Sequence, residues 1–270
     1  KRKNEHRPHL GGSQIGNECS RALWYQFRHA WSPNFEGRML RLFETGDREE
    51  DRIVANLRAV GVTVWEKDPE TGLQVRFEAC GGHFAMSLDG VGEGFKESKK
   101  PHTLEFKTMN EKSFKATKSM GVKQSKPIYW AQCQLGMHLA GLDRCFFFAV
   151  NKNTDEIYGE RIRLDKAEAK LLISKAENVV FSALPPEKLS DDPSDWRCKF
   201  CSYFAVCHGC KIPEVSCRTC SHVTPERDGT WSCSKGKPAV TCDDHLYIPQ
   251  IMPSDLVLVD AGDDFVDYED

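Results

Sequence analysis

The stretch from residue 102 to residue 109 constrains the fold of this chain most, because apolar and charged residues alternate along it. Successive side chains of an extended strand point to opposite faces. Leu104 and Phe106 would therefore enter a hydrophobic core. Glu105 and Lys107 would share the opposite face, roughly 7 Å apart. We predict a strand over residues 102–109 with one apolar and one charged face.

A second acidic residue, Asp89, lies sixteen residues before Glu105 in another apolar stretch. Two carboxylates and an ammonium group on one surface suit metal-assisted hydrolysis of a phosphodiester. The carboxylates hold a hard cation such as Mg²⁺, which activates water, and the lysine orients the nucleophile or stabilises charge. A solvated strand face with an ordinary ion pair is the alternative, since an isolated Glu-x-Lys pair is common.

A predicted helix over residues 43–57 contributes another carboxylate. Its apolar stripe includes Phe43 and Ile53, and helical spacing places Glu50 on the same stripe. A carboxylate on an inward face is costly unless it is paired or binds a metal. The neighbouring Glu49 and Asp51 are better explained as surface charge.

A second predicted helix, over residues 127–140, has Gln132 among its apolar positions. An amide can both donate and accept hydrogen bonds, so it suits a site that contains carboxylates and water. A buried glutamine that only satisfies a backbone group is the equally simple alternative.

These residues together carry a family resemblance. Gly46-x-x-x-Glu50, Asp89, Glu105-x-Lys107 and Tyr129-Trp130-Ala131-Gln132 precede a hydrophobic strand at 145–150. Their order resembles the PD-(D/E)xK nucleases, most closely the phage lambda-type exonucleases and the RecB-like branch, over about residues 10–165. The resemblance implies an α/β fold with a restriction-endonuclease-like core, in which helices flank a mixed central sheet. It also implies a metal-dependent deoxyribonuclease of phage-type DNA recombination or replication, more an exonuclease than an endonuclease.

The resemblance also implies roles for single residues. Asp89, Glu105 and Phe106 would form a site for Mg²⁺ or Mn²⁺, with Lys107 as the catalytic lysine. Glu50 would support the metal or its water, and Gln132 would help to position the active site or DNA. Many RecB-like members carry histidine where this chain has Glu50, which favours the lambda-like subgroup.

Twelve cysteines form the second conspicuous feature. The sequence has no amino-terminal segment like a signal peptide and no run long enough to cross a membrane, so we expect a reducing cytoplasm, that of the bacterial host if the protein is phage-encoded. Clustered thiols in such a compartment bind metals more often than they form disulfides. Cys80, Cys133 and Cys145 stand apart and are expected to be ordinary buried thiols.

Cys19 and the close set Cys198, Cys201 and Cys207 resemble the pattern of iron–sulfur nucleases such as the AddB type. In those proteins a [4Fe–4S] cluster clasps the two ends of the nuclease fold, and thiolates are the usual ligands of such clusters. The competing assignment is a local zinc knuckle that uses Cys198, Cys201, Cys207 and Cys210.

A third group of cysteines follows the spacing of a compact zinc ribbon: Cys217, Cys220, Cys233 and Cys242, with His245 three residues further on. Tetrahedral Zn²⁺ takes four thiolate or imidazole ligands. We assign the four cysteines and keep His245 as the alternate fourth ligand. About 40 residues with few large apolar side chains could hardly bury a core without a metal.

We therefore expect three regions: a nuclease core over 1–210 closed by the first cysteine set, a zinc-ribbon module over 211–250, and an acidic tail over 251–270. Strands are predicted near 62–66, 73–79, 83–91, 102–109, 145–151 and 157–164. Helices are predicted over 17–30, 43–57 and 127–140, and one more is predicted after Asp165.

The net charge of −3 is unevenly distributed. Lysines are concentrated just after the predicted active-site strand, where they could neutralise backbone phosphates or simply form a solvated face. The candidates for DNA contact are Lys112, Lys115, Lys118, Lys123 and Lys126. The expected partners are duplex or single-stranded DNA and a recombination or replication protein, with no membrane and an open oligomeric state. The rival hypotheses are an endonuclease, RNA as the substrate, and a catalytically silent DNA-binding or assembly module that recruits partners through its Cys-rich end.

Overall fold

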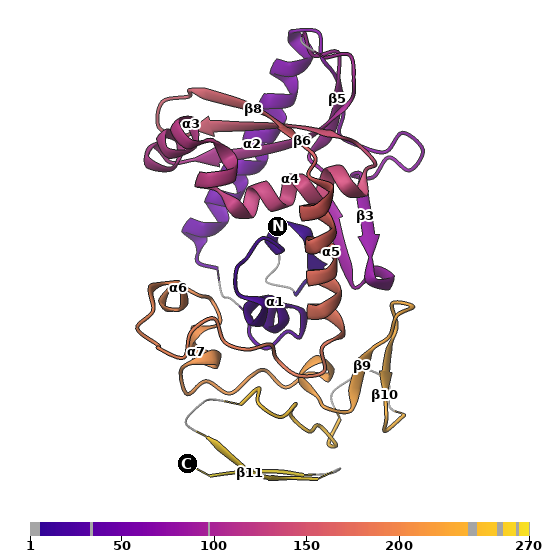
Figure 1. Cartoon of the computed structure of the whole chain (residues 1–270), viewed down its shortest axis with the longest axis vertical. Helices are drawn as coiled ribbons and strands as arrows, with labels where there is room; N and C mark the ends of the chain where they lie inside the picture. Colours follow the sequence, from indigo (N-terminus) through magenta and orange to yellow (C-terminus); the bar gives the residue numbers. More distant parts are fainter. Residues whose placement is uncertain are drawn as a thin grey trace.

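The computed structural model describes residues 6–32, 35–96, 98–236, 242–252, 256–262 and 265–269. Its upper half holds a five-stranded sheet with helices on both faces, so the predicted mixed α/β class is confirmed (Figure 1). The α-helices are α1 (Ser20–Phe27), α2 (Gly37–Ala59), α3 (Glu111–Ser125), α4 (Pro127–Leu139), α5 (Lys166–Phe181), α6 (Trp196–Lys199) and α7 (Phe204–Cys207).

The central sheet has the strand order β2-β5-β6-β7-β8, with β6 in the middle. Strands β6 and β7 run parallel, and all other neighbours are antiparallel. Its strands are β2 (Thr63–Trp65), β5 (Gly90–Glu93), β6 (His102–Met109), β7 (Arg144–Asn151) and β8 (Ile157–Arg163).

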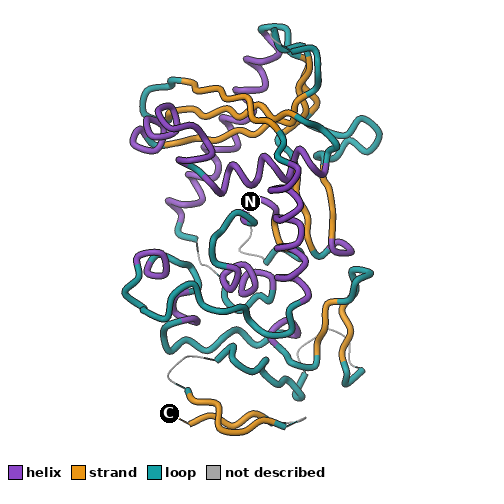
Figure 2. Tube along the Cα trace, viewed as in Figure 1, coloured by secondary structure: helices purple, strands orange, loops and turns teal. Residues whose placement is uncertain are grey.

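Three smaller sheets complete the described strands (Figure 2). The first has the order β1-β4-β3 and packs beside the central sheet, and the other two are hairpins near the C-terminus. These strands are β1 (Leu10–Gly11), β3 (Arg76–Ala79), β4 (Phe84–Ser87), β9 (Val223–Pro225), β10 (Trp231–Cys233), β11 (Val257–Ala261) and β12 (Val266–Glu269). Short 3-10 helices occur at Gly12–Gln14, Cys80–Gly82 and Cys217–Thr219.

Helix α2 covers one face of the central sheet, where Ile53 and Leu57 pack with Leu104 and Phe106 of β6. Helices α3 and α4 cover the other face, where their apolar side chains pack with those of β7. The alternation predicted for residues 102–109 is therefore confirmed on its apolar side. The charged side of β6 faces the layer of α4.

Two elements differ from the sequence predictions. The single strand predicted over 83–91 is wrong, because the chain divides there into β4 and β5, which belong to different sheets, with Leu88 and Asp89 between them. The lysine-rich segment, for which no element was predicted, forms α3. Asn110 caps α3 by accepting a hydrogen bond from the backbone N–H of Ser113, 2.9 Å away.

The largest core lies around α1 and α5 and reaches into the C-terminal region. Ile248 and Ile251 are completely or almost completely buried in it, although residue 251 is where the sequence places the start of the acidic tail. The guanidinium of Arg28, at the end of α1, lies inside this region and donates to the carbonyl oxygens of Ser182 and Val223, both at 3.2 Å. Parts of the described segments 213–236 and 242–251 are therefore joined to the core by packing and by buried hydrogen bonds.

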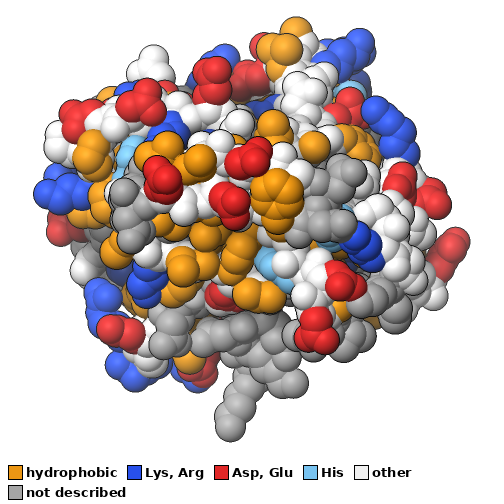
Figure 3. Space-filling view, turned by 90° about the horizontal axis from the view of Figure 1, so that it is seen from below, with side chains coloured by type: hydrophobic (Ala, Val, Ile, Leu, Met, Phe, Trp, Pro, Cys, Tyr) orange, Lys and Arg blue, Asp and Glu red, His pale blue; other side chains and the backbone are white. Residues whose placement is uncertain are grey.

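The described part of the predicted tail forms the hairpin β11–β12, and Ser254, Asp255, Asp263, Asp264 and Asp270 lie outside the described residues. Val257 and Val259 of the hairpin are exposed. The end of the molecule that carries the hairpin is seen from below in Figure 3, where hydrophobic side chains gather over the middle of the face. Within the described residues, no helix combines the length and the apolar character that a membrane crossing requires.

Candidate active site and cysteine sites

Strand β6 brings Glu105 and Lys107 together as the alternation predicts. The carboxylate of Glu105 is 2% exposed and forms an ion pair with the ammonium of Lys107, which is 21% exposed. The Lys107 ammonium also lies 5.3 Å from the centre of the Tyr129 ring in α4. An acid–base pair is thus held inside the layer between the sheet and α4.

Asp89 reaches the same place because the ladder between β5 and β6 ends at the pair Gly90 and Leu104. Beyond this pair, one oxygen of Asp89 accepts a hydrogen bond from the backbone N–H of Phe106 at 2.8 Å. The carboxylate therefore takes the place of a backbone acceptor on the edge of β6. The break between β4 and β5, which the sequence did not predict, is what positions it there.

The electrostatics of the site centre on the buried carboxylate of Glu105. Burial raises the pKa of Glu105 to about 8, and the charges of Asp89 and Glu50 act in the same direction, while Lys107 opposes the shift. Burial disfavours the charged form of Lys107, but Glu105 and Asp89 outweigh it and raise the pKa of Lys107. Three carboxylates thus face one ammonium group, an arrangement that suits an additional cation.

A cavity of about 350 Å³ opens beside this pair, between α2, β6 and the start of α4. Glu50 lines it together with Lys107, as the helical stripe predicted. Asp47 and Glu49 line it as well, although Glu49 had been assigned to the surface; it is 20% exposed and pairs with Arg52 at 3.0 Å. The i, i+3 spacing of residues 47 and 50 was the available signal for Asp47. We call this space the α2–β6 cavity.

The two glutamines of α4 have different environments. Gln132 is 6% exposed and lies one turn after Tyr129 on the same side of the helix. Gln134 is completely buried; its amide donates to the carbonyl of Arg163 at 2.9 Å and accepts from the backbone N–H of Asp165 at 2.7 Å. Gln134 thus fixes the turn between β8 and α5, a structural role that sequence reasoning did not identify.

The donor set at β6 fits a hard divalent cation, because it combines carboxylates with a backbone carbonyl. The carbonyl of Phe106 accepts a hydrogen bond from the Lys107 ammonium at 3.1 Å, while the side chain of Phe106 is buried in the core. Lys107 therefore occupies the two oxygens, of Glu105 and Phe106, that the sequence assigned to the metal. In the described part of the chain, no three His, Cys, Asp or Glu side chains are already arranged around a common metal position. Metal binding would require these side chains to rearrange.

The lysines proposed for DNA contact lie on and just after α3. Lys112, Lys115, Lys118 and Lys123 are exposed and Lys126 is half-buried. Three of them already have acidic partners: Lys115 pairs with Glu111 at 2.6 Å, Lys118 with Glu156 at 3.2 Å and Lys123 with Glu168 at 3.7 Å. Their positive charge is partly compensated, which weakens the case for a strongly basic surface on α3.

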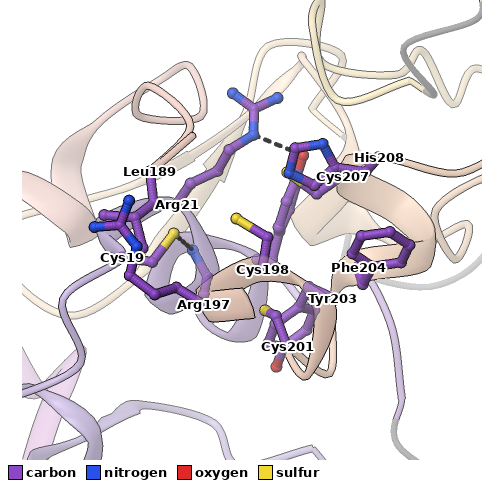
Figure 4. A pocket seen from close by; sticks show the side chains of 12 residues that line it. Cys19, Arg21, Leu189, Arg197, Cys198, Cys201, Tyr203, Phe204, Cys207 and His208 are labelled. Atoms are coloured by element: carbon purple, nitrogen blue, oxygen red, sulfur yellow. Dashed lines mark hydrogen bonds between the residues drawn. The ribbon is translucent and has the colours of Figure 1, made fainter. Parts of the chain in front are cut away.

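The first cysteine set converges on one pocket. Cys19 at the start of α1 shares the pocket with Cys198, Cys201 and Cys207, and Figure 4 shows their side chains around the same hollow. Burial raises the pKa of Cys207, and the nearby Cys19 and Cys198 contribute to the shift. Cys210, which the zinc-knuckle alternative requires, is exposed.

The thiols of the second cysteine set influence one another electrostatically. Burial raises the pKa of Cys217, and Cys242, Cys220 and Cys233 add to the shift through their charge. His245 instead lies 3.2 Å from the hydroxyl of Thr219 and packs edge-on against Tyr247. Cys133 and Cys145 are buried as expected, whereas Cys80, for which burial was also predicted, is only partly buried.

Fold and site together define a mixed α/β protein with a buried acid–lysine site on its central sheet. No protein-family model and no curated protein sequence match the chain. Among solved structures, it is similar to an alkaline exonuclease (LHK-Exo) from Laribacter hongkongensis, with 18% identity, a TM-score of 0.45, and 64% of this chain and 87% of that chain covered. It is also similar to SSO0001, with 14% identity, a TM-score of 0.45, and coverage of 77% and 87%. LHK-Exo in complex with dAMP is similar with 16% identity and a TM-score of 0.42, and the match covers 63% of this chain and 85% of that chain.

Proposed function

We propose that this chain is a divalent-metal-dependent DNA nuclease that acts as an exonuclease. The observation that carries the proposal is the convergence of Asp89, Glu105 and Lys107 on β6, with Glu50 reaching toward them from α2. Two of these carboxylates come from segments that only the tertiary fold brings to β6. A buried Glu105 with two further carboxylates nearby and a single lysine is costly without a ligand.

Each residue has a role that its position supports. Asp89, Glu105 and the carbonyl of Phe106 would hold Mg²⁺ or Mn²⁺, and Glu50 would complete the acidic wall of the α2–β6 cavity. When bound, the cation would activate water and neutralise charge developing at phosphorus. Lys107, released from these oxygens, would turn its ammonium toward the scissile phosphate and stabilise its charge. Gln132 would position neighbouring groups from α4.

The test is cleavage of linear and circular duplex DNA with Mg²⁺, with Mn²⁺ and with EDTA. Metal-dependent loss of linear DNA is the expected result, while nicking of circles would indicate an endonuclease. Glu105→Ala and Lys107→Ala should each abolish cleavage and leave DNA binding largely intact, because they remove the metal ligand and the stabilising cation. Turnover that either variant leaves unchanged would refute the assignment, and binding without any metal-dependent cleavage would favour the silent assembly module.

The proposal extends to the two cysteine sites. A [4Fe–4S] cluster at Cys19, Cys198, Cys201 and Cys207 would tie α1 to the segment after α5, and the shared pocket supports this set over one that includes Cys210. Zn²⁺ at Cys217, Cys220, Cys233 and Cys242 would close the C-terminal region, and the contact between His245 and Thr219 supports the four-cysteine set.

A further inference from the structure

A second and larger hollow lies beside the first cysteine site. It has a volume of about 620 Å³ and lies between the start of α1, the start of α4 and α6. Four aromatic side chains line it, and three of them are exposed: Trp196 is 74% exposed, Phe200 is 84% exposed and Phe35 is 37% exposed, while Tyr203 is partly buried. We call it the aromatic groove. Several exposed apolar side chains gathered along one hollow are typical of a binding surface.

Helix α6 holds two of these rings outward. Cys198 in its middle is buried toward the cysteine pocket, while Trp196 before it and Phe200 after it remain in solvent. Asp195 caps the helix by accepting from the backbone N–H of Arg197 at 2.9 Å, and the Arg197 side chain pairs with Glu18 across the groove wall at 3.3 Å. The two rings are therefore fixed on a short, anchored element.

The aromatic groove adjoins the α2–β6 cavity. Phe35 of the groove packs edge-on against Phe43 of the cavity, with ring centres 5.3 Å apart. The first turn of α4 joins them on the other side, because Ile128 lines the groove and Tyr129 lines the cavity. A chain lying in the groove would thus lead directly to Lys107.

The lining suits unpaired nucleobases. Aromatic rings accept any base by stacking, and Gln14 and Gln26 add amides that can pair with base edges. The exposed Arg38 and Arg41 come three and six residues after Phe35, at the start of α2, so positive charge follows the Phe35 end of the groove in the sequence. In a duplex, each base face is covered by its neighbours, so only unpaired bases can reach these rings.

We infer that the aromatic groove binds single-stranded nucleic acid and guides its end into the α2–β6 cavity. This inference rests on the proposed nuclease function for the fate of the strand, but the binding itself does not require cleavage. Trp196 and Phe200 would stack on successive bases, and the substrate of the site would be a single strand or the frayed end of a duplex.

The test measures binding without chemistry. The probes are a dT20 strand and a 20-base-pair duplex, both labelled with fluorescein. Binding is measured by fluorescence anisotropy in buffer without added divalent cation. Trp196→Ala and Phe200→Ala should each weaken dT20 binding roughly tenfold, the loss that stacking on one base typically supplies, and duplex binding should change little. Trp196→Phe and Phe200→Tyr should retain most of the affinity, since both keep an aromatic face.

Two controls separate this effect from damage to the fold. Phe265→Ala removes an exposed aromatic ring from the C-terminal hairpin, outside the groove, and should leave dT20 affinity unchanged. The iron and zinc contents of each variant should equal those of the wild type, because Trp196 and Phe200 flank a cysteine site without belonging to it. If a variant contains as much iron and zinc as the wild type but binds dT20 more weakly, the lost affinity is due to stacking.

Cleavage distinguishes the groove from the nuclease site. Hydrolysis of a small diester, thymidine 5′-phosphate p-nitrophenyl ester, needs only the α2–β6 cavity and should be retained by Trp196→Ala, while cleavage of dT20 falls. If no variant or metal gives cleavage but dT20 binding depends on the rings, the nuclease proposal fails and the groove stands. The groove assignment is overturned if wild type does not bind dT20, which would favour a protein partner, or if both alanine variants bind it as wild type does.

Discussion

At the scale of single residues, burial decides which charges this protein tolerates. Arg28 is 2% exposed, so its charge is buried at a cost in free energy. Carbonyl acceptors offset this cost, and so do the rings of Trp24 and Trp231, whose centres lie 5.4 and 5.5 Å from the guanidinium carbon. Burial, followed by the charge of Arg218, lowers the pKa of Arg28 to about 10. Among the described residues, Lys107 is the side-chain donor to Glu105, and this imbalance is the reason for the cation proposed at this site.

A histidine in the same region gives a prediction about pH. Burial, followed by the charge of Arg218, lowers the pKa of His29 from 6.5 to about 4. The unfolded chain therefore takes up a proton near pH 6.5 while the folded chain does not, so stability that is present above pH 6.5 is lost as the pH falls toward 4. His29→Asn should flatten this part of the stability curve, and asparagine tolerates the positive φ of 53° at this position.

The measurement is urea unfolding of both proteins at several values between pH 7.5 and pH 4. As the pH falls, the unfolding free energy of the wild type should decrease more than that of His29→Asn. Parallel curves over this range would show that His29 is not the group responsible.

At the scale of elements, α2 shows how helical spacing distributes carboxylates between a site and solvent. Ile53, Val54 and Leu57 are buried as the predicted stripe requires, and Glu50 lies on the same side and lines the α2–β6 cavity. Asp51, one residue further, is exposed. Neighbouring acids of similar chemistry thus differ only by the rotation of about 100° per residue in a helix.

This pair provides a matched test of the acidic wall. Glu50→Gln should raise the Mg²⁺ concentration needed for half-maximal cleavage and lower the rate by at least about tenfold, as expected when a group that supports the metal is lost. Asp51→Asn removes the same charge from the same helix without touching the cavity and should behave as wild type. Equal effects of the two substitutions would indicate a general electrostatic influence of α2 and no specific role for Glu50.

At the scale of the whole molecule, α1 is an element that contacts several segments that follow α5 in the sequence. Cys19 caps its start and shares a pocket with three cysteines almost 180 residues later, and Arg21 donates to the carbonyl oxygens of Pro186 and Gln250, both at 2.9 Å. Its far end carries Arg28, whose guanidinium lies among the C-terminal segments. A metal at the first cysteine site would therefore strengthen a closure that packing has already built.

Cysteine substitutions separate the cluster from the zinc knuckle. After anaerobic purification, Cys19→Ser should lose iron and unfold at a lower temperature, while Cys210→Ser should keep both properties, because only Cys19 shares the pocket. Serine still caps a helix well, so loss of the hydrogen bond from Ala22 to the Cys19 sulfur would not explain the effect. Iron lost from Cys210→Ser and kept in Cys19→Ser would support the knuckle.

The amino-acid sequence determined the elements whose signals are local. The alternation of residues 102–109 specified β6, helical periodicity specified α2 and α4, and Asp165 specified the start of α5, where it accepts from the backbone N–H groups of Ala167 and Glu168. Cysteine spacing likewise grouped Cys198, Cys201 and Cys207, which line one pocket with Cys19. Such signals depend on contacts within one strand or one helix, so the sequence contains them directly.

Only the tertiary structure decided how these elements combine into sites. The division of residues 83–91 between two sheets places Asp89 beside Phe106, and no local pattern distinguishes one long strand from two short strands with different partners. No local pattern predicts three further features: the position of Glu49 in the wall of the α2–β6 cavity, the burial of Ile251, and the contact between Phe35 and Phe43. These features arise from packing between distant segments, where the free energy of burial selects among arrangements that the local sequence leaves equally open.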